Sequence, residues 1–446
     1  MSNHNQLTEK KQVFLGIAII GVVFFIIGFV SWVNSILIPY FKIACELTNF
    51  QSYFVTFAFY IAYLVMSIPV AYLLKSTGYK RGMMFGFICL SCGAFLFVPA
   101  ALGRIYGIFL TGLFIMGTGL SILQAAANPY ITIIGPIESA ARRISVMGIC
   151  NKFAGIISPL IFAAVVLHSS QEIIRSLEEG LVSEDAKEMV LNELIRGVIW
   201  PYTILGIILL GIGIFINYSS LPDINPEQEN ERIENLNQNK TSIFQFPYLI
   251  LGVIALFLHV GTQVIAIDTI IPYAGSMGVS LLDAKFFPSY TLGTTIIGYV
   301  FGILFIPKIV SQKNALIFCT VSGLILSFGV LWTDQIVSLF GHKANVSIWF
   351  LASLGLPNSL IYAGIWPHAI RDLGRFTKMG ASLLVMALCG NAILPLIYGK
   401  LADITSLQKG YWVLIPCFIY LIWYATTGYK ITDWKSVCKI YIKNKG

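Results

Sequence analysis

The sequence predicts an all-α polytopic membrane protein with twelve transmembrane helices in two six-helix halves, and three observations carry this prediction. Of the 446 residues, 57% are hydrophobic and only 11% are charged, whereas soluble domains are about 25% charged. The apolar residues gather in stretches of the roughly 20 residues that a spanning helix needs. Motifs of the first half recur in order in the second. This composition excludes a soluble enzyme, a nucleic-acid-binding protein and a disordered chain.

Twelve apolar stretches are long enough to cross a bilayer. The first is not a cleavable signal sequence, because it is too long and lacks a cleavage site of small residues. Aromatic residues near several stretch ends, such as Trp200, Tyr202 and Trp412, suit the membrane–water interface. The predicted spans are residues 13–40, 50–74, 82–101, 106–134, 145–167, 197–218, 244–273, 286–306, 314–333, 345–367, 380–400 and 411–430.

These spans divide the chain into five parts. A long loop at 168–196 is acidic and helix-prone, and we interpret it and the polar linker between the halves as solvated connections. The predicted parts are a cytoplasmic N-terminus (1–12), an N-terminal six-helix half (13–218), a cytoplasmic linker (219–243), a C-terminal six-helix half (244–430) and a cytoplasmic tail (431–446).

The basic residues predict how the chain is threaded. About two-thirds of the Lys and Arg residues fall in loops on the same side as both termini, and such loops are usually cytoplasmic. We therefore expect a multi-pass protein of the cell (inner or plasma) membrane with both ends in the cytoplasm. The net charge of +8 then reflects topology, and no nucleic-acid partner is expected. Cys89 and Cys92 fall in an apolar run and are interpreted as packing thiols.

An internal repeat relates the two halves. Ser35–Tyr40 in the first span resembles Asp268–Tyr273 in the seventh, and Val146–Cys150 in the fifth resembles Val385–Cys389 in the eleventh. A parallel repeat of six helices is the architecture of the major facilitator superfamily, in which substrate binds near the midplane between two rocking halves. The sequence therefore predicts the major facilitator fold.

Three ionisable residues stand alone inside the predicted spans. Asp268 is the only acid well inside a span, Lys152 the only base and His259 the only histidine, and such groups are costly at membrane depth. Asp268 is interpreted as a carboxylate that accepts a sugar hydroxyl or a proton, with a hydrated structural acid as the alternative. Lys152 lines the cavity, pairs with Asp268 or snorkels to the interface, and His259 either contacts ligand or joins helices.

Neutral polar residues are numerous in the first, fourth, seventh and tenth spans. Amides both donate and accept hydrogen bonds, which suits the hydroxyls of a sugar, although each amide alone is better explained by a bond between helices. The predicted substrate-binding residues are Trp32, Asn34, Ser35, Gln124, Asn128, Asn151, Lys152, His259, Gln263, Asp268, Asn358 and Asn391.

Several motifs carry a family resemblance over nearly the whole chain. Ala125–Tyr130, followed by Gly135–Ala140, resembles the fourth-span signature of the fucose:proton symporter family, which belongs to the major facilitator superfamily and includes glucose/galactose transporters. Ile36–Tyr40, Asn49–Ser52 and Leu373–Ser382 also resemble motifs of that family. The resemblance implies a sugar permease.

The chain departs from the family at informative positions. Ser35 and Gln124 stand where the fucose symporter pattern has acids implicated in proton coupling and sugar binding, and Lys152 stands where a small polar residue is usual. The proton mechanism therefore does not carry over. Because the repeat pairs Asp268 with Ser35, we hypothesise that the coupling carboxylate has moved across the cavity. Asp268 and Lys152 are the coupling candidates.

These observations predict a permease that imports a neutral hexose (glucose/galactose, fucose or an N-acetylhexosamine) by alternating access, with cation symport. A monomer in the lipid bilayer is expected, with no metal and no cofactor, and with a co-transported proton or sodium ion left open. A passive uniporter and an exporter of another small polar metabolite are the alternatives. A membrane-embedded enzyme would need a cluster of acids or histidines within the spans, so none is expected.

Overall fold

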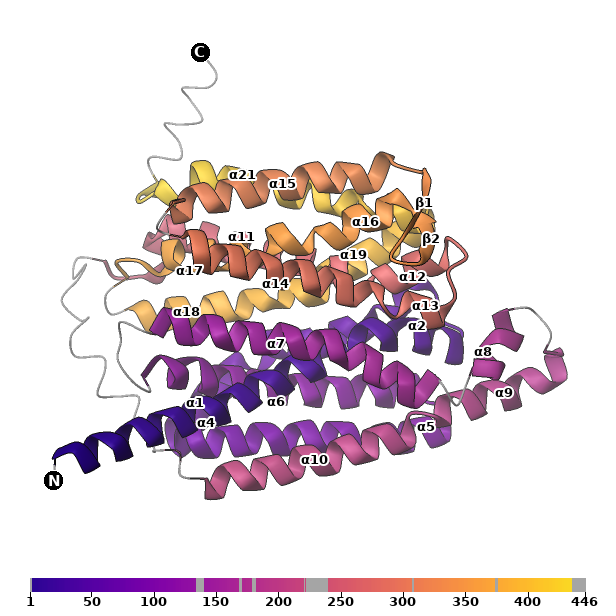
Figure 1. Ribbon diagram of the computed structural model, residues 1–446, viewed down its shortest axis with the longest axis horizontal. Helices are drawn as coiled ribbons and strands as arrows, with labels where there is room; N and C mark the ends of the chain where they lie inside the picture. The colour runs from indigo at the N-terminus through magenta and orange to yellow at the C-terminus, as the bar shows by residue number, and fades with distance from the viewer. Residues whose placement is uncertain are drawn as a thin grey trace, which may run out of the picture.

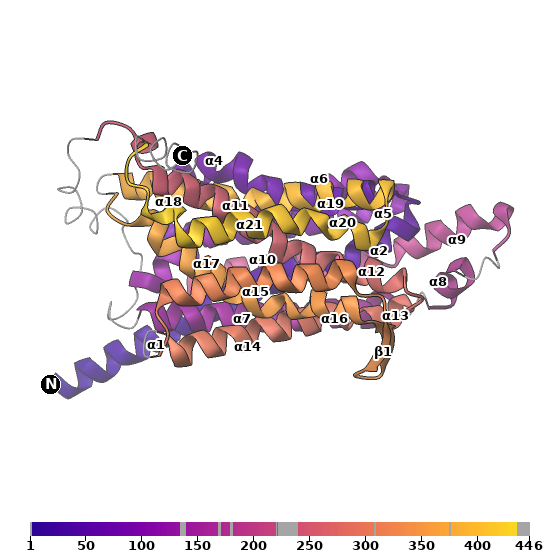
Figure 2. The same cartoon turned by 90° about the horizontal axis from the view of Figure 1, so that it is seen from above.

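The computed structural model describes residues 2–133, 140–167, 171–178, 182–219, 221, 240–306, 309–373 and 376–434. The chain forms a bundle of long helices in which α1 (Ser2–Trp32) starts and α21 (Leu414–Thr426) finishes at the same end (Figure 1). We call this the terminal end. The opposite end, which carries α8 (Gln171–Glu178), α9 (Glu184–Arg196) and a β-hairpin, is called the distal end (Figures 1 and 2).

The N-terminal half runs from α1 to α10. Its further elements are α2 (Asn34–Ala44), α3 (Asn49–Ser52), α4 (Phe54–Phe95), α5 (Phe97–Gly103), α6 (Tyr106–Ile133), α7 (Ala140–Phe162), a π-helical turn (Ala163–Leu167) and α10 (Ile199–Tyr218).

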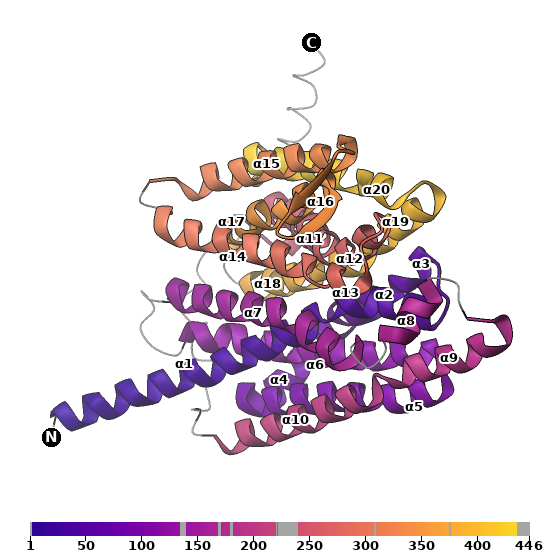
Figure 3. The same cartoon turned by 45° about the vertical axis from the view of Figure 1, so that its right-hand side comes forward.

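The C-terminal half packs against the first (Figure 3). It contains α11 (Pro247–Asp268), α12 (Ile270–Gly275), α13 (Leu281–Ala284), α14 (Phe287–Phe305), α15 (Gln312–Trp332), α16 (Val346–Ser353), α17 (Gly355–Ile370), α18 (Thr377–Met386), α19 (Gly390–Ile404) and α20 (Leu407–Gly410) before α21, with 3-10 turns at Ile243–Gln245, Ala387–Cys389, Tyr411–Val413 and Gly428–Lys430.

The twelve predicted spans are confirmed. Within the described residues, 11 apolar helical segments are long enough to cross a membrane, and one of them, Phe54–Gly103, is 50 residues long. That segment holds both the second and the third predicted span. Gly78 separates them with a φ of 75°, a conformation that costs glycine little and other residues much.

Other segments differ from the prediction in detail. The first span is interrupted at Val33, between α1 and α2. The acidic loop forms α8 and α9, which agrees with its predicted helical tendency. A hairpin of β1 (Ile336–Leu339) and β2 (His342–Asn345) adds two short strands to an otherwise helical fold. Its turn is tight because Phe340 and Gly341 both have positive φ. Most of the linker, most of the tail, and the motif residues 135–139 and 374–375 lie outside the described residues.

Glycines set the closest helix approaches. A Cβ at Gly117 of α6 would overlap the carbonyl oxygen of Phe59 in α4, and a Cβ at Gly28 of α1 would overlap that of Asn151 in α7. Small residues allow this close packing where no hydrophobic effect drives helices together. Between the halves, α7 packs on α14 and α4 on α19, so the halves meet along helices that carry candidate site residues.

The Gly117 contact can be tested by thermal unfolding in detergent. Gly117→Ala should lower stability by about 1–3 kcal/mol, because the added methyl group must push α4 and α6 apart. Gly211→Ala is the matched control, since no atom lies within 4 Å of a Cβ there. Equal melting temperatures for the two variants would contradict this account of the packing.

Candidate functional site

The candidate residues lie at two depths in the bundle. Helices α7 and α11 both start at the terminal end, and Lys152 and His259 each lie 12 positions after the first residue of their helix, Ala140 and Pro247. At about 1.5 Å per residue, both are about 18 Å from that end. Asp268 lies nine positions beyond His259, about 14 Å nearer the distal end. We call these depths the middle layer and the distal layer.

The N-terminal half supplies a polar cluster to the middle layer. The Lys152 ammonium lies 4.2 Å from the centroid of the Trp32 ring, a cation–π contact. The Trp32 indole N–H donates to Asn151 Oδ1 at 3.5 Å, and Asn151 Nδ2 donates to the Phe24 carbonyl oxygen at 3.3 Å. A side chain at Gly155 would overlap Trp32, so glycine there lets α7 pack directly against the indole ring.

The C-terminal half supplies His259 to the same layer. Its side chain is 0% exposed, and neither ring nitrogen has a hydrogen-bond partner among the described residues. It lies at the depth of Lys152, which is near enough to act on it electrostatically from the other half. Buried polar groups in native proteins are nearly always hydrogen-bonded. The His259 nitrogens thus leave hydrogen-bonding capacity unused among the described residues.

Three of the predicted asparagines also have buried amide atoms without a hydrogen-bond partner in the described part of the chain. Both amide atoms of Asn34 and of Asn358, and Oδ1 of Asn391, have no partner among the described residues. Leaving a buried polar atom unsatisfied costs about 1–3 kcal/mol. These three asparagines come from both halves, and each offers donor or acceptor atoms that a sugar hydroxyl can satisfy.

The remaining neutral candidates differ in their contacts and in their exposure. Gln124 Nε2 donates to the Tyr63 hydroxyl at 2.8 Å, and Ser35 Oγ donates to the Trp32 carbonyl oxygen at 2.9 Å. The two residues that replace the acids of the family pattern thus bond within the N-terminal half. Gln263 is half-buried and Asn128 is exposed.

Asp268 lies in the distal layer, covered by the other half. Its side chain is 0% exposed. Its Oδ2 accepts a hydrogen bond from Thr56 Oγ1 of α4 at 3.4 Å, while Oδ1 has no partner among the described residues. Tyr53 and Tyr60, from the same part of the N-terminal half, are close enough to interact with the carboxyl group electrostatically. The two halves are therefore closed over Asp268.

The pairing of Lys152 with Asp268, one of the alternatives that the sequence left open, is absent from the described residues. Lys152 lies over Trp32 and Asp268 accepts from Thr56, and the described residues contain no ion pair between the two. The reason is depth, because the helical register separates the two layers by about 14 Å along the bundle axis.

A gate at the distal end joins the halves. Asp403 of α19 accepts hydrogen bonds from the backbone N–H of Asn49 at 3.1 Å, from Asn49 Nδ2 at 2.7 Å and from the backbone N–H of Phe50 at 2.9 Å. The rings of Tyr53 and Tyr398 meet edge to face beside these bonds, with centroids 5.6 Å apart. Sequence reasoning missed this gate, since Asp403 lies just beyond the predicted eleventh span and its partners are 353 and 354 residues away.

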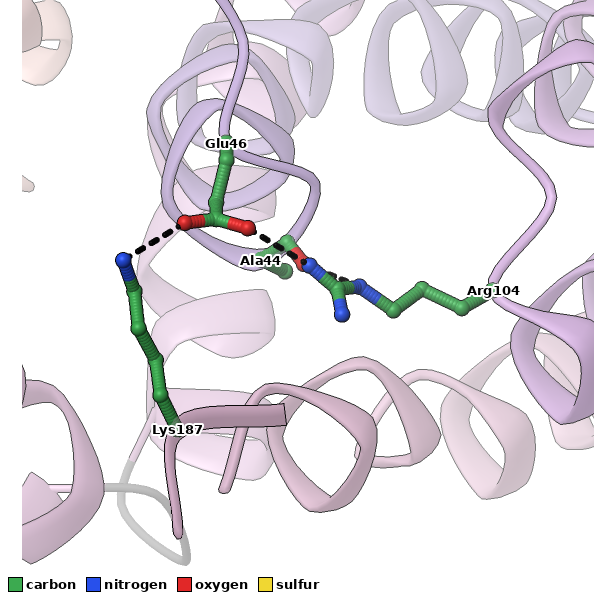
Figure 4. A network of polar contacts seen from close by, with 4 residues as sticks. All are labelled: Ala44, Glu46, Arg104 and Lys187. Carbon is green, nitrogen blue, oxygen red and sulfur yellow. Dashed lines mark hydrogen bonds and ion pairs between the residues drawn. The ribbon is translucent and has the colours of Figure 1, made fainter. Parts of the chain in front are cut away.

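A second network ties α9 to the distal end of the N-terminal half (Figure 4). Glu46 accepts from Lys187 of α9 at 2.8 Å and from Arg104 at 3.3 Å, while Arg104 Nε donates to the Ala44 carbonyl oxygen at 2.8 Å. The hydrogen bond from Lys187, together with the positive charges of Lys187 and Arg104, lowers the pKa of the Glu46 carboxyl group. The ion pairs are solvent-exposed, so their stabilising effect is small.

The Glu46 network predicts how α9 responds to charge removal. Glu46→Gln should increase hydrogen exchange in Glu184–Arg196, because α9 loses its ionic tie. Because the pKa of Glu46 is lowered on folding, the tie is present above the unfolded pKa and is lost as the pH falls through the folded pKa. The wild type should therefore approach the variant only in acid.

The matched control is Glu188→Gln, an exposed acid on the same helix. It should leave exchange in α9 unchanged. Equal exchange in the wild type and Glu46→Gln at neutral pH would show that other contacts hold α9.

Two six-helix halves, closed at one end over buried polar side chains, define a membrane transporter that works by alternating access. The sequence model of the Major Facilitator Superfamily matches residues 20–391. The chain belongs to that superfamily.

Relatives with named functions cover almost the full chain. A glucose/galactose transporter of Brucella abortus biovar 1 (strain 9-941) is 30% identical over 430 residues, which are 96% of this chain and 97% of the relative. An L-fucose-proton symporter of Escherichia coli (strain K12) is 27% identical over 405 residues, which are 89% of this chain and 88% of the relative.

Solved structures agree with the fold. The fucose:proton symporter FucP, in its outward conformation, matches with a TM-score of 0.68 at 25% identity, over 93% of this chain and 98% of that one. An inward-facing bacterial homolog of the human lysosomal transporter Spinster matches with a TM-score of 0.62 at 14% identity, over 93% of this chain and 96% of that one. The second likeness concerns the fold alone.

Proposed function

We propose that the chain is a sugar permease that imports a hexose-sized sugar into the cytoplasm by alternating access, coupled to one proton carried by Asp268. The observation that carries the coupling is the burial of this carboxyl group between the halves, against Thr56. Relatives named as glucose/galactose transporters and L-fucose-proton symporters support the sugar cargo. The sugar leaves chemically unchanged, so the protein is a transporter and no enzyme.

The middle layer binds the sugar. Asn34 and Asn358 present amide atoms from opposite halves, and His259 presents ring nitrogens. A sugar hydroxyl both donates and accepts, so it can satisfy such groups in pairs. Cargo bound this way joins the two halves, and it lowers the cost of closing them around buried polar groups.

Asp268 couples proton binding to closure of the distal end. An ionised carboxylate taken out of water costs several kcal/mol unless it is well paired, and among the described residues Asp268 receives a hydrogen bond only from Thr56, at 3.4 Å. Closure over Asp268 therefore favours the neutral acid. A proton taken from the distal side then enters with the cargo and leaves when the terminal end opens.

The distal gate must break for cargo to enter. Opening separates Asp403 from the Asn49 and Phe50 donors, all of which are exposed enough to bond to water instead. Replacing these hydrogen bonds by bonds to water therefore costs little free energy, which suits a gate that opens in every transport cycle. Under this proposal the distal end faces outward and the terminal end faces the cytoplasm, in a monomer within the cell membrane.

The driving force sets the scale of accumulation. One positive charge crossing a potential of 100 mV is worth about 2.3 kcal/mol, or roughly 50-fold accumulation of a neutral sugar. Sodium coupling and passive uniport are the competing mechanisms, and neither needs a proton on Asp268.

Uptake into proteoliposomes tests the proposal. The wild type should exchange a sugar in counterflow and accumulate it when a proton gradient is imposed without sodium. Asp268→Asn should reduce accumulation to equilibrium while counterflow remains measurable, because the amide cannot carry a proton. The matched control, Asp283→Asn in an exposed distal turn, should accumulate sugar like the wild type.

The outcomes separate the parts of the proposal. Accumulation by Asp268→Asn would exclude Asp268 as the coupling group. Counterflow by the wild type without any response to the proton gradient would indicate sodium coupling or uniport. No exchange of any sugar would overturn the permease itself.

A further inference from the structure

A positive charge on Lys152 would have no balancing carboxylate among the described residues. Its side chain is 7% exposed, and the described part of the chain places no carboxylate in ion-pair contact with its ammonium group. The Trp32 ring, 4.2 Å away, attracts the cation but brings no negative charge. A buried amine stays charged only when it is paired, so the ammonium form of Lys152 needs a counter-ion that the described residues do not supply.

His259 belongs to the same site as Lys152. It lies at the same depth on the opposite half, it is fully buried with both ring nitrogens unpartnered among the described residues, and it interacts electrostatically with Lys152. A neutral imidazole donates one N–H, and an ammonium group donates three. Together the two side chains offer hydrogen-bond donors from both halves around one positive charge.

The charge balance of the transport cycle points to the missing partner. With Asp268 ionised and Lys152 charged, the two span-interior groups cancel. When Asp268 takes up its proton and the halves close over it, the ammonium form of Lys152 would be left without an opposite charge. A neutral hexose does not supply that charge, whereas a cargo with one negative charge stabilises the ammonium group.

We propose that Lys152 and His259 form a carboxylate-binding subsite, and that the permease takes a hexose-sized sugar acid, such as a hexuronate, in preference to the parent hexose. This inference rests on the proposed permease function and narrows its cargo. The Lys152 ammonium and the His259 N–H donate to the carboxylate, while Asn34 and Asn358 serve the hydroxyls. A phosphate is the poorer fit, because it brings about −1.5 to −2 charges at neutral pH against one cation.

Counterflow in proteoliposomes tests the subsite, because it measures exchange of a substrate in the absence of a proton gradient. Substrate preference is therefore measured separately from proton coupling. The probes are D-galactose against D-galacturonate, D-glucose against D-glucuronate, and D-glucose 6-phosphate. The wild type should half-saturate with a hexuronate at a concentration about 10- to 100-fold lower than with the parent hexose, which is the worth of a charge-assisted hydrogen bond. The 6-phosphate should compete less well than the hexuronates.

Variants of Lys152 test whether its charge causes the preference for hexuronates over hexoses. Lys152→Gln keeps a polar side chain but removes the charge, and it should weaken hexuronate exchange at least tenfold more than hexose exchange. Lys152→Arg keeps the charge and should restore the preference. The control is Lys285→Gln, since Lys285 also lies over an aromatic ring, Phe286 at 5.2 Å, but in a distal turn. It should keep the wild-type preference.

Three results would overturn the subsite. The first is exchange of hexoses without exchange of hexuronates, which leaves the permease standing. The second is an equal effect of Lys152→Gln on both sugar classes, which would make Lys152 merely structural. The third is equal exchange of the 6-phosphate and the hexuronates, which contradicts a site for a single charge. Failure to exchange any of the probes would instead count against the permease.

Discussion

The cost of enclosing a charge in the membrane interior is the constraint on which the rest of this structure depends. The spans hold one acid and one base, and the bundle places them about 14 Å apart along its axis, so neither neutralises the other directly. Asp268 is buried between the halves, where it accepts a long hydrogen bond from Thr56. The Lys152 side chain contacts the ring of Trp32. Under the proposed function, closure with only the proton or only the cargo aboard is therefore disfavoured. A transporter coupled in this way needs no further device to prevent half-loaded movement.

The two layers divide the work of transport. Both halves contribute buried polar atoms without partners among the described residues, including those of Asn34, His259 and Asn358, and under the proposed function a bound sugar holds the halves together through them. The distal layer senses the proton at Asp268, next to a gate in which Asp403 binds Asn49 and Phe50. The gate bonds are exposed, so breaking them costs little free energy, because water replaces each lost hydrogen bond. The two layers are buried, and under the proposed function the proton and the cargo bound there determine when the gate opens.

The spans were predictable because apolar length is a local property of the sequence, and even Gly78, the break inside the longest helix, is marked by its residue type. The ionisable candidates were found because charges are scarce within apolar runs. The gate was not predictable, since Asp403 and Asn49 are 354 residues apart, and the motif that holds Asn49 does not indicate its partner. The sequence could not choose between the alternatives for Lys152 for a related reason: a repeat aligns residues between halves, but helical register and the position of Trp32 decide which side chains meet.

The central claim is that the distal gate closes the outer entrance and that breaking it opens this end while the terminal end closes. The direct measurement is double electron–electron resonance between spin labels on cysteines introduced at Leu102 and Thr405, at the distal end of each half, and between Ser76 and Met379 at the terminal end, in a background without native cysteines. Asp403→Ala should shift the distal distance distribution to longer values and the terminal distribution to shorter ones. Distributions that are unchanged by Asp403→Ala, or that move in the same direction at both ends, would contradict the account.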